Sequence, residues 1–125
     1  MGMTLELHRN QDLLYEAKVD ISSATTTAVI SLAQGGGKRW RVYKMFLVFG
    51  TACSLDIQNG STSLTGVMTF TAGDTLILPL DQTSWFVGDA GSALNFVTTT
   101  AGTVNLRGRV YYTQHVVSSA TAGPT

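Results

Sequence analysis

The chain has 125 residues, the length of one ordinary domain, which is enough to bury a hydrophobic core without disulfide staples. Eight basic residues balance eight acidic ones, so the overall field attracts neither nucleic acid nor an anionic membrane, and a charged partner must meet a local patch. The sequence contains no long apolar run, and residues 1–20 lack the pattern of a secretory leader, so we expect neither a membrane span nor a leader.

Residues 1–27 are expected to form an N-terminal arm. The spacing of Leu13, Leu14 and Ala17 allows a short helix over residues 9–18, but so short a segment fits an extended arm equally well. From residue 28 onward the apolar period is two, and Gly, Asn and Asp separate the apolar segments. The expected domain therefore spans residues 28–117, and the small polar residues 118–125 are expected to be a flexible tail.

The alternating segments predict short strands joined by tight turns. We expect strands at residues 28–33, 39–49, 53–58, 63–70, 75–80, 93–98 and 103–115. Asn59-Gly60 supplies the positive φ of a tight hairpin turn, and Pro79 lacks a backbone donor, so the strand that contains it belongs at a sheet edge. In the last strand Leu106 and Val110 alternate with polar residues and are expected in the core. The pattern predicts an all-β sandwich or barrel.

The strand 39–49 changes character along its length. Trp40 and Val42 are expected to point inward, while residues 45–49 are apolar on both faces. Because a strand of a two-layer sandwich normally has one wet face, we expect the N-terminal arm or another subunit to cover this run. The residues that we assign to an oligomer interface are Met45, Leu47 and Phe49.

The sequence has no pattern typical of a catalytic or metal site, so we expect no enzyme, no cofactor and no metal. Gly-x-Ser-x-Gly is absent, and His8 and His115 have no zinc-ligand spacing. Cys53 is expected to be a buried, reduced hydrophobic residue. Four aspartates near turns are expected to bond their own backbone, although spacing alone does not decide whether two of them face each other across a cleft. These are Asp56, Asp74, Asp81 and Asp89.

The strongest local signal is the segment KRWRVYK at residues 38–44, where cations and aromatic residues interleave. Grooves for single-stranded nucleic acid use this mixture, but strand alternation puts Trp40 on the face opposite the arginines. We therefore expect a solvated basic patch, which would suit an acidic protein partner and not nucleic acid. The residues that we assign to partner binding are Lys38, Arg39, Arg41, Arg107 and Arg109.

An aromatic pair, Trp85-Phe86, follows the strand that contains Pro79. Such a pair usually plugs the open end of a sandwich, and this is the role that we expect, because aromatic burial contributes strongly to small cores. If the pair is exposed instead, it is a platform on which sugar rings can stack.

Roughly residues 38–112 carry a family resemblance. The segments KRWRVYKMFLV, SLDIQNGSTSLTGVMTF, AGDTLILPL, SWFVGDAGSALNF and GTVNLRGRVYYTQ follow one another in that order. This series resembles small virion structural proteins of tailed bacteriophages, namely capsid decoration or cement proteins and head-fibre proteins. The resemblance implies a jelly-roll-like antiparallel β-sandwich without catalytic residues.

The resemblance also implies a role and a place. It implies a protein made in the host cytoplasm that binds the outside of a phage head, commonly as a homotrimer, and stabilises contacts of the major capsid protein or another virion protein. The alternative is a carbohydrate- or receptor-binding β-module of a phage fibre or tail, with Trp85 and Phe86 in its ligand surface. No membrane partner is expected.

Overall fold

A computed structural model describes residues 14–31, 37–100 and 102–116 of the chain. The elements within these residues are strands: β1 (Tyr15–Ile21), β2 (Thr26–Ile30), β3 (Lys38–Phe49), β4 (Cys53–Asn59), β5 (Thr62–Phe70), β6 (Thr75–Leu78), β7 (Phe86–Val87), β8 (Leu94–Thr99) and β9 (Leu106–Val116). In this part of the chain there is no helix long and apolar enough to cross a membrane.

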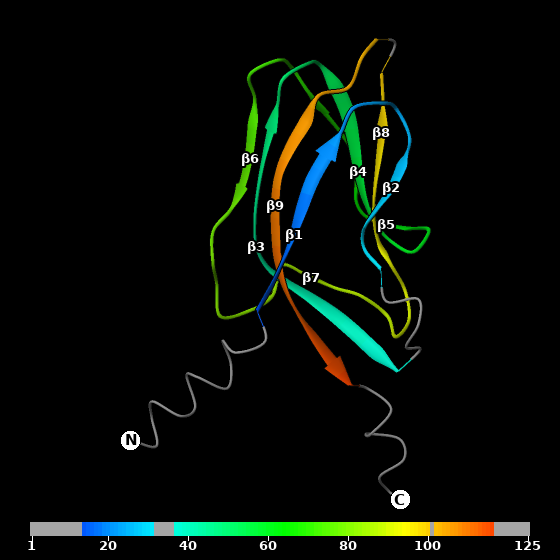
Figure 1. The fold of residues 1–125 in the computed structure, drawn as a ribbon, viewed down its shortest axis with the longest axis vertical. Coiled ribbons are helices and arrows are strands. Elements are labelled where there is room, and N and C mark those ends of the chain that lie inside the picture. Colours follow the sequence, from blue (N-terminus) through cyan, green and yellow to red (C-terminus); the bar gives the residue numbers. More distant parts are fainter. Residues whose placement is uncertain (1–13, 32–36, 101, 117–125) are drawn as a thin grey trace, which may run out of the picture.

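The strands form two antiparallel sheets that make the two layers of a sandwich (Figure 1). Sheet A has the order β1-β9-β3-β6, with β7 also paired to β3, and sheet B has the order β2-β8-β4-β5. If the two-residue β7 is set aside and β8 and β9 are counted as the seventh and eighth strands, the orders become 1-8-3-6 and 2-7-4-5. This is the strand order of a jelly roll. The prediction of an all-β, jelly-roll-like sandwich is confirmed.

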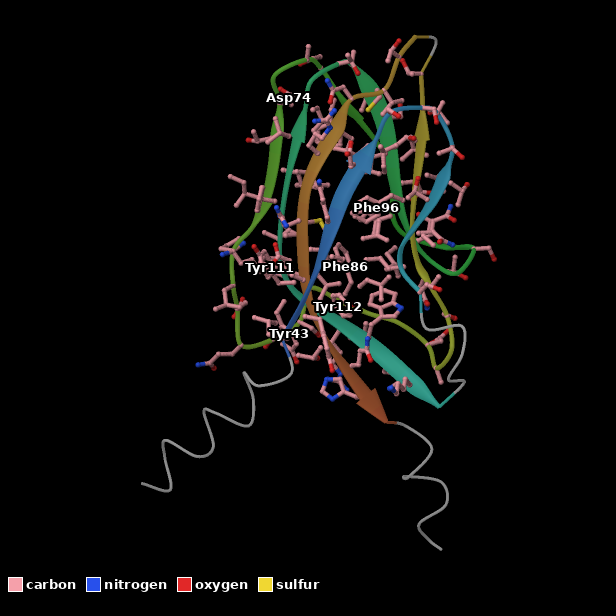
Figure 2. The ribbon with its side chains drawn as sticks, viewed as in Figure 1. Tyr43, Asp74, Phe86, Phe96, Tyr111 and Tyr112 are labelled. Carbon is pink, nitrogen blue, oxygen red and sulfur yellow. The ribbon has the colours of Figure 1, made fainter. Side chains whose placement is uncertain are left out.

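The hydrophobic core lies between the two sheets and is built from alternate residues of their strands. Phe49 of β3 and Phe96 of β8 are both fully buried, and Phe96 points into the space between the layers (Figure 2). The Phe49 ring stacks on the Phe70 ring with 3.9 Å between centroids. Cys53 is buried beside this core, as its neighbours in the sequence predicted, and burial raises the pKa of its thiol. The thiol therefore behaves as a small hydrophobic group.

Turn residues fix the connections that the sequence predicted. The hairpin between β4 and β5 closes with Gly60 and Ser61, and Gly60 has a φ of 62°, as the first central residue of a type II′ turn requires. Asp74 accepts a hydrogen bond from the backbone N–H of Thr71 at 2.8 Å, which ties the turn before β6. β6 is one of the two edge strands of sheet A, in agreement with the position of Pro79 just after it.

A β-bulge in the middle of β3 reverses the faces of this strand. Val42 pairs with Tyr112 and Lys44 pairs with Tyr111, so Tyr43 is an extra residue between two ladder positions. An extra residue shifts the alternation of side chains by one position. Even-numbered residues point inward before the bulge, and odd-numbered residues point inward after it.

The bulge overturns the assignment of an oligomer interface on β3. Its three residues are fully buried between the sheets, so they pack in the core of the domain and are not available to another subunit: Met45, Leu47 and Phe49. The outward apolar residues of this half of the strand are instead Phe46 and Val48, which are exposed.

The N-terminal arm that the sequence analysis predicted at residues 1–27 is wrong for its second half. β1 pairs with β9 from Tyr15 opposite Tyr112 to Ile21 opposite Leu106, and Val19 and Ile21 are buried in the core. Residues 15–21 therefore form an edge strand of sheet A beside β9 and do not cover the outer face of β3. The short helix considered for residues 9–18 does not include residues 15–18. Residues 1–13 and the expected tail at 118–125 lie outside the described residues.

Candidate functional site

The outward face of sheet A carries most of the residues that the sequence analysis assigned to partner binding. β3 and β9 pair in antiparallel register over almost their whole length, and opposite residues of such a pair point to the same side. The outward side chains of this ladder are, on β9, Arg107, Arg109, Tyr111, Thr113 and His115, and on β3, Val48, Phe46, Lys44, Arg41 and Arg39.

The register divides the predicted basic surface into two groups. Arg107 lies opposite Val48 and Arg109 lies opposite Phe46, five or more positions along β3 from Arg41. The Lys44 ammonium lies 5.1 Å from the centroid of the Tyr111 ring, between the two groups. The arginines of the two strands therefore do not form one continuous basic surface, although β3 and β9 are direct neighbours.

Lys38, the fifth residue assigned to this surface, stands apart from the arginines. It is exposed at the start of β3, opposite Val116. It shares the parity of the inward-pointing Trp40, so it leaves the strand on the side away from Arg39.

The first arginine group is neutralised by β1. Arg107 Nε lies 2.8 Å from Asp20 Oδ1, and Arg109 Nη1 lies 2.6 Å from Glu16 Oε2. All four side chains are substantially exposed. Sequence reasoning missed this compensation because it placed both acids on a detached arm. The available signal was their alternation with Val19 and Ile21, which is typical of a half-buried strand.

We expect these ion pairs to add little to stability. Exposed pairs contribute about 0–1 kcal/mol each, because water screens them and the side chains lose rotamer freedom. Asp20→Asn and Glu16→Gln should each lower the free energy of unfolding by no more than about 1 kcal/mol, measured by urea denaturation. A loss several times larger would contradict this description of the pairs as surface charges.

The second arginine group lies where β3 begins and β9 ends, and we call it the basic cluster: Arg39, Arg41, Thr113 and His115. Arg39 faces His115 and Arg41 faces Thr113 across the ladder. Thr113 is only 5% exposed, and its Oγ1 lies 2.6 Å from His115 Nε2. The Nε atoms of Arg39 and Arg41 are buried and find no hydrogen-bond partner within residues 14–31, 37–100 and 102–116. Burial lowers the pKa of His115, and the charges of Arg41 and Arg39 lower it further.

An apolar strip separates the first arginine group from the edge of sheet A. It consists of Phe46, Val48 and Ile77, which are 37%, 44% and 63% exposed. Phe46 and Ile77 are direct partners in the β3–β6 ladder, so their side chains are neighbours on the outward face. Large apolar side chains grouped on one face are typical of a surface that contacts another protein.

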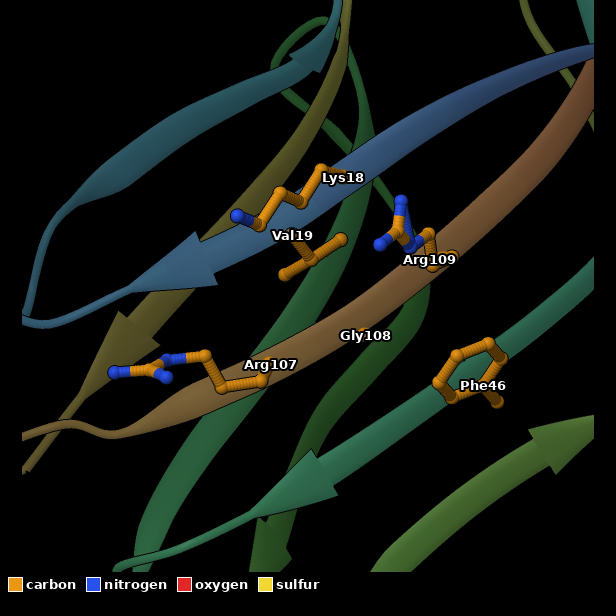
Figure 3. Close-up of a pocket in the computed structure, with 6 residues that line it drawn as sticks. All are labelled: Lys18, Val19, Phe46, Arg107, Gly108 and Arg109. Atoms are coloured by element: carbon orange, nitrogen blue, oxygen red, sulfur yellow. The ribbon is translucent and has the colours of Figure 1, made fainter.

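A shallow hollow of about 210 Å³ adjoins the apolar strip (Figure 3). It lies over the backbone of Gly108, where β9 has no side chain. Arg107 and Arg109 stand on either side of Gly108, with Lys18 of β1 and Phe46 of β3 on the flanks. The hollow therefore has an apolar wall toward the strip and cationic walls along β9.

The aromatic pair at residues 85–86 is split between surface and core. Phe86 pairs with Val42 and packs against the core, as expected of a plug. Trp85 is 41% exposed, and its Nε1–H donates to the carbonyl of Pro79 at 2.9 Å. The prediction of a core plug is thus wrong for Trp85, because successive residues of a strand point to opposite sides.

The fully buried tryptophan is Trp40, at the inner side of the same end of the sandwich. Its Nε1–H donates to the carbonyl of Ser92 at 3.0 Å, and the backbone N–H of Gly88 donates to the carbonyl of Trp40 at 2.9 Å. Among the residues that the structure describes, no group of three His, Cys, Asp or Glu side chains is placed to hold a metal ion.

Comparisons with known proteins add little. No protein-family model matches the sequence, and no curated protein matches it significantly. A chain of the Bacillus endospore appendages, which form a family of disulfide-linked pili, resembles this structure with a TM-score of 0.45. The two chains are 12% identical, and the likeness covers 84% of this chain and 89% of that one. A likeness at this level carries no conclusion about what this chain does.

Proposed function

We propose that the chain is a structural virion protein of a tailed bacteriophage, a decoration or cement protein that binds the outside of the head as a trimer and stabilises contacts between capsid subunits. The observation that carries the proposal is the apolar strip on the outward face of sheet A. The phage assignment itself rests on the resemblance of residues 38–112 to small virion proteins.

The apolar strip has the anatomy of a protein contact. Three large apolar side chains are exposed together, and ion-paired arginines border them on β9. Contacts between proteins commonly combine an apolar centre with a polar rim. Burying apolar area yields about 25 cal/mol per Å², whereas exposed ion pairs yield about 0–1 kcal/mol each, so the strip supplies most of the affinity.

Two changes on the strip test the proposal. Phe46→Ser together with Ile77→Ser should leave the fold intact, because both side chains point outward, and should reduce both the trimer fraction and the occupancy on phage heads. Sedimentation velocity measures the trimer, and electron cryo-microscopy of particles carrying the protein measures position and occupancy. The matched control is Val67→Ser, a side chain that is 70% exposed on β5 of sheet B, and it should behave as wild type.

Two results would contradict the proposal. If the double variant has the same trimer fraction and head occupancy as the wild type, the apolar strip is not the contact surface. Localisation of the protein on fibres or tails, with bare heads, would replace decoration by the alternative role.

A carbohydrate- or receptor-binding module is the second candidate, and the exposure of Trp85 favours it. An exposed indole offers a flat apolar ring to a sugar, and Leu80, 62% exposed, follows the Pro79 carbonyl that holds this indole. Trp85→Ala should then abolish binding on a glycan array while the protein remains folded. Under the decoration proposal, the wild-type protein binds no glycan.

A further inference from the structure

Within the part of the chain that the structure describes, the arginines of the basic cluster have no counter-charge, unlike the other arginines on the same face. Arg107 and Arg109 each have a carboxylate from β1. Among the ion pairs between described residues, neither Arg39 nor Arg41 takes part, and the Nε atom of each is buried without an acceptor. Like charges so close together repel, and buried donors without acceptors are costly. An arrangement of this kind is stabilised by an external acceptor.

The donors of the cluster converge from two adjacent strands. Arg39 and Arg41 are two residues apart on β3 and point the same way, while β9 brings His115 and Thr113 directly opposite them. Opposite residues of an antiparallel pair lie about 4.5–5.5 Å apart at Cβ, so two guanidinium groups and an imidazole border one small area. Planar guanidinium forks match the two oxygens of a carboxylate in bidentate geometry.

We infer that the basic cluster is an oxyanion-binding site whose ligand is the carboxylates of an acidic polypeptide segment. Nucleic acid is the less suitable source of oxyanions, because Trp40, the aromatic residue between the two arginines, is fully buried on the opposite face. Single-stranded nucleic-acid sites add such a ring to their cations as a stacking platform. The inference does not depend on the apolar strip, which lies farther along β3 and β9.

His115 reports occupancy of this site. Among the described residues, the charged groups that face it are Arg39 and Arg41 of β3. The next strand, β7, presents uncharged Val87 opposite Arg41, and β1 begins at Tyr15, opposite Tyr112. In the free protein these charges and burial hold the pKa of His115 below its ordinary 6.5. A bound anion offsets the repulsion and raises that pKa, so binding takes up a proton. Affinity should therefore increase as the pH falls from about 7 to about 5.5.

The experiment follows the His115 ring by NMR while an oxyanion is added. Sulfate is the first probe because its charge is constant over this pH range, and chloride at equal ionic strength is its control. Sulfate should raise the pKa of His115, and chloride should not. A hexaglutamate peptide is the second probe and should bind with an affinity that Arg39→Gln with Arg41→Gln lowers about tenfold or more. Arg107→Gln, which removes an arginine from the same face, should change it by less than about twofold.

Further variants and outcomes keep the inference testable. Arg39→Lys with Arg41→Lys retains both charges and loses the planar forks, so it should still weaken hexaglutamate binding, and it replaces the glutamine pair if that variant does not fold. If sulfate and chloride shift the pKa of His115 equally, the basic cluster is not a specific oxyanion-binding site. Tighter binding of a single-stranded oligonucleotide than of hexaglutamate would overturn the choice of ligand. Both results leave the trimer and head-occupancy tests of the apolar strip unaffected.

Discussion

Replacing Trp40 by alanine is expected to lower the free energy of unfolding by about 3–5 kcal/mol, as deletion of a large buried aromatic side chain does. The ring is fully buried and its Nε1–H donates to the carbonyl of Ser92. Gly88 packs so closely against the indole that a Cβ on this residue would lie 2.1 Å from a ring atom. The substitution thus leaves a cavity and an unpaired carbonyl where the loop around β7 meets β3.

The other tryptophan is the matched control. Trp85→Ala should cost only about 1–2 kcal/mol, because its side chain is 41% exposed and loses less buried area. Urea denaturation of the two variants is followed by circular dichroism. Fluorescence is unsuitable, because each substitution removes a tryptophan and so changes the fluorescence signal itself. Equal losses for the two substitutions, or a larger loss for Trp85, would contradict the burial that distinguishes them.

Alternation along single strands was enough to predict the fold class and part of the core. Trp40, Val42, Leu106 and Val110 are buried as their period-two patterns required. Turn chemistry was equally informative, since the hairpin between β4 and β5 depends on a positive φ at Gly60, which glycine adopts easily. Such features are local, so a single sequence contains them.

The outcome was different where structure depends on distant segments or on one additional residue. The bulge at Tyr43 exchanged the inner and outer faces of the second half of β3, and nothing in the composition of residues 39–49 marks the position of an extra residue. β1 was missed because its alternating acids were considered for a helix or an arm. Its role depends on pairing with β9, about 90 residues later in the chain, as the bond from Arg109 to Glu16 illustrates.

The candidate site also combines features that local alternation predicts with features that depend on how distant strands pair. Alternation correctly placed Arg39, Arg41, Arg107 and Arg109 on the surface, but only the register of β3 against β9 separates them into two groups. The net charge of each arginine group also depends on β1. Its carboxylates pair with Arg107 and Arg109, and no described residue of β1 forms an ion pair with Arg39 or Arg41. The apolar strip depends on both the bulge and the β3–β6 pairing. Alternation in a single sequence shows which residues share a face of a regular strand, but not which exposed residues of different strands become neighbours.

Gly108→Ala is expected to destabilise the protein by about 3 kcal/mol, the upper part of the range for overpacking. Gly108 lies in β9 between its partners Val19 of β1 and Leu47 of β3. A Cβ at this position would lie 1.9 Å from the carbonyl oxygen of Phe46 and 3.0 Å from the Cα of Leu47. Both contacts involve backbone atoms, so a change of side-chain rotamer cannot relieve them, and β9 must move away from β3.

Gly102→Ala provides the control, because a Cβ there meets no atom within 4 Å and should change the free energy of unfolding by no more than about 1 kcal/mol. The midpoints of urea denaturation distinguish the two variants. Phe46 also belongs to the apolar strip, so under the proposed function a separation of β9 from β3 should also weaken the proposed trimer contact in Gly108→Ala at temperatures where the domain is still folded. A midpoint for Gly108→Ala equal to that of Gly102→Ala would mean that β3 and β9 do not approach each other this closely at their centre.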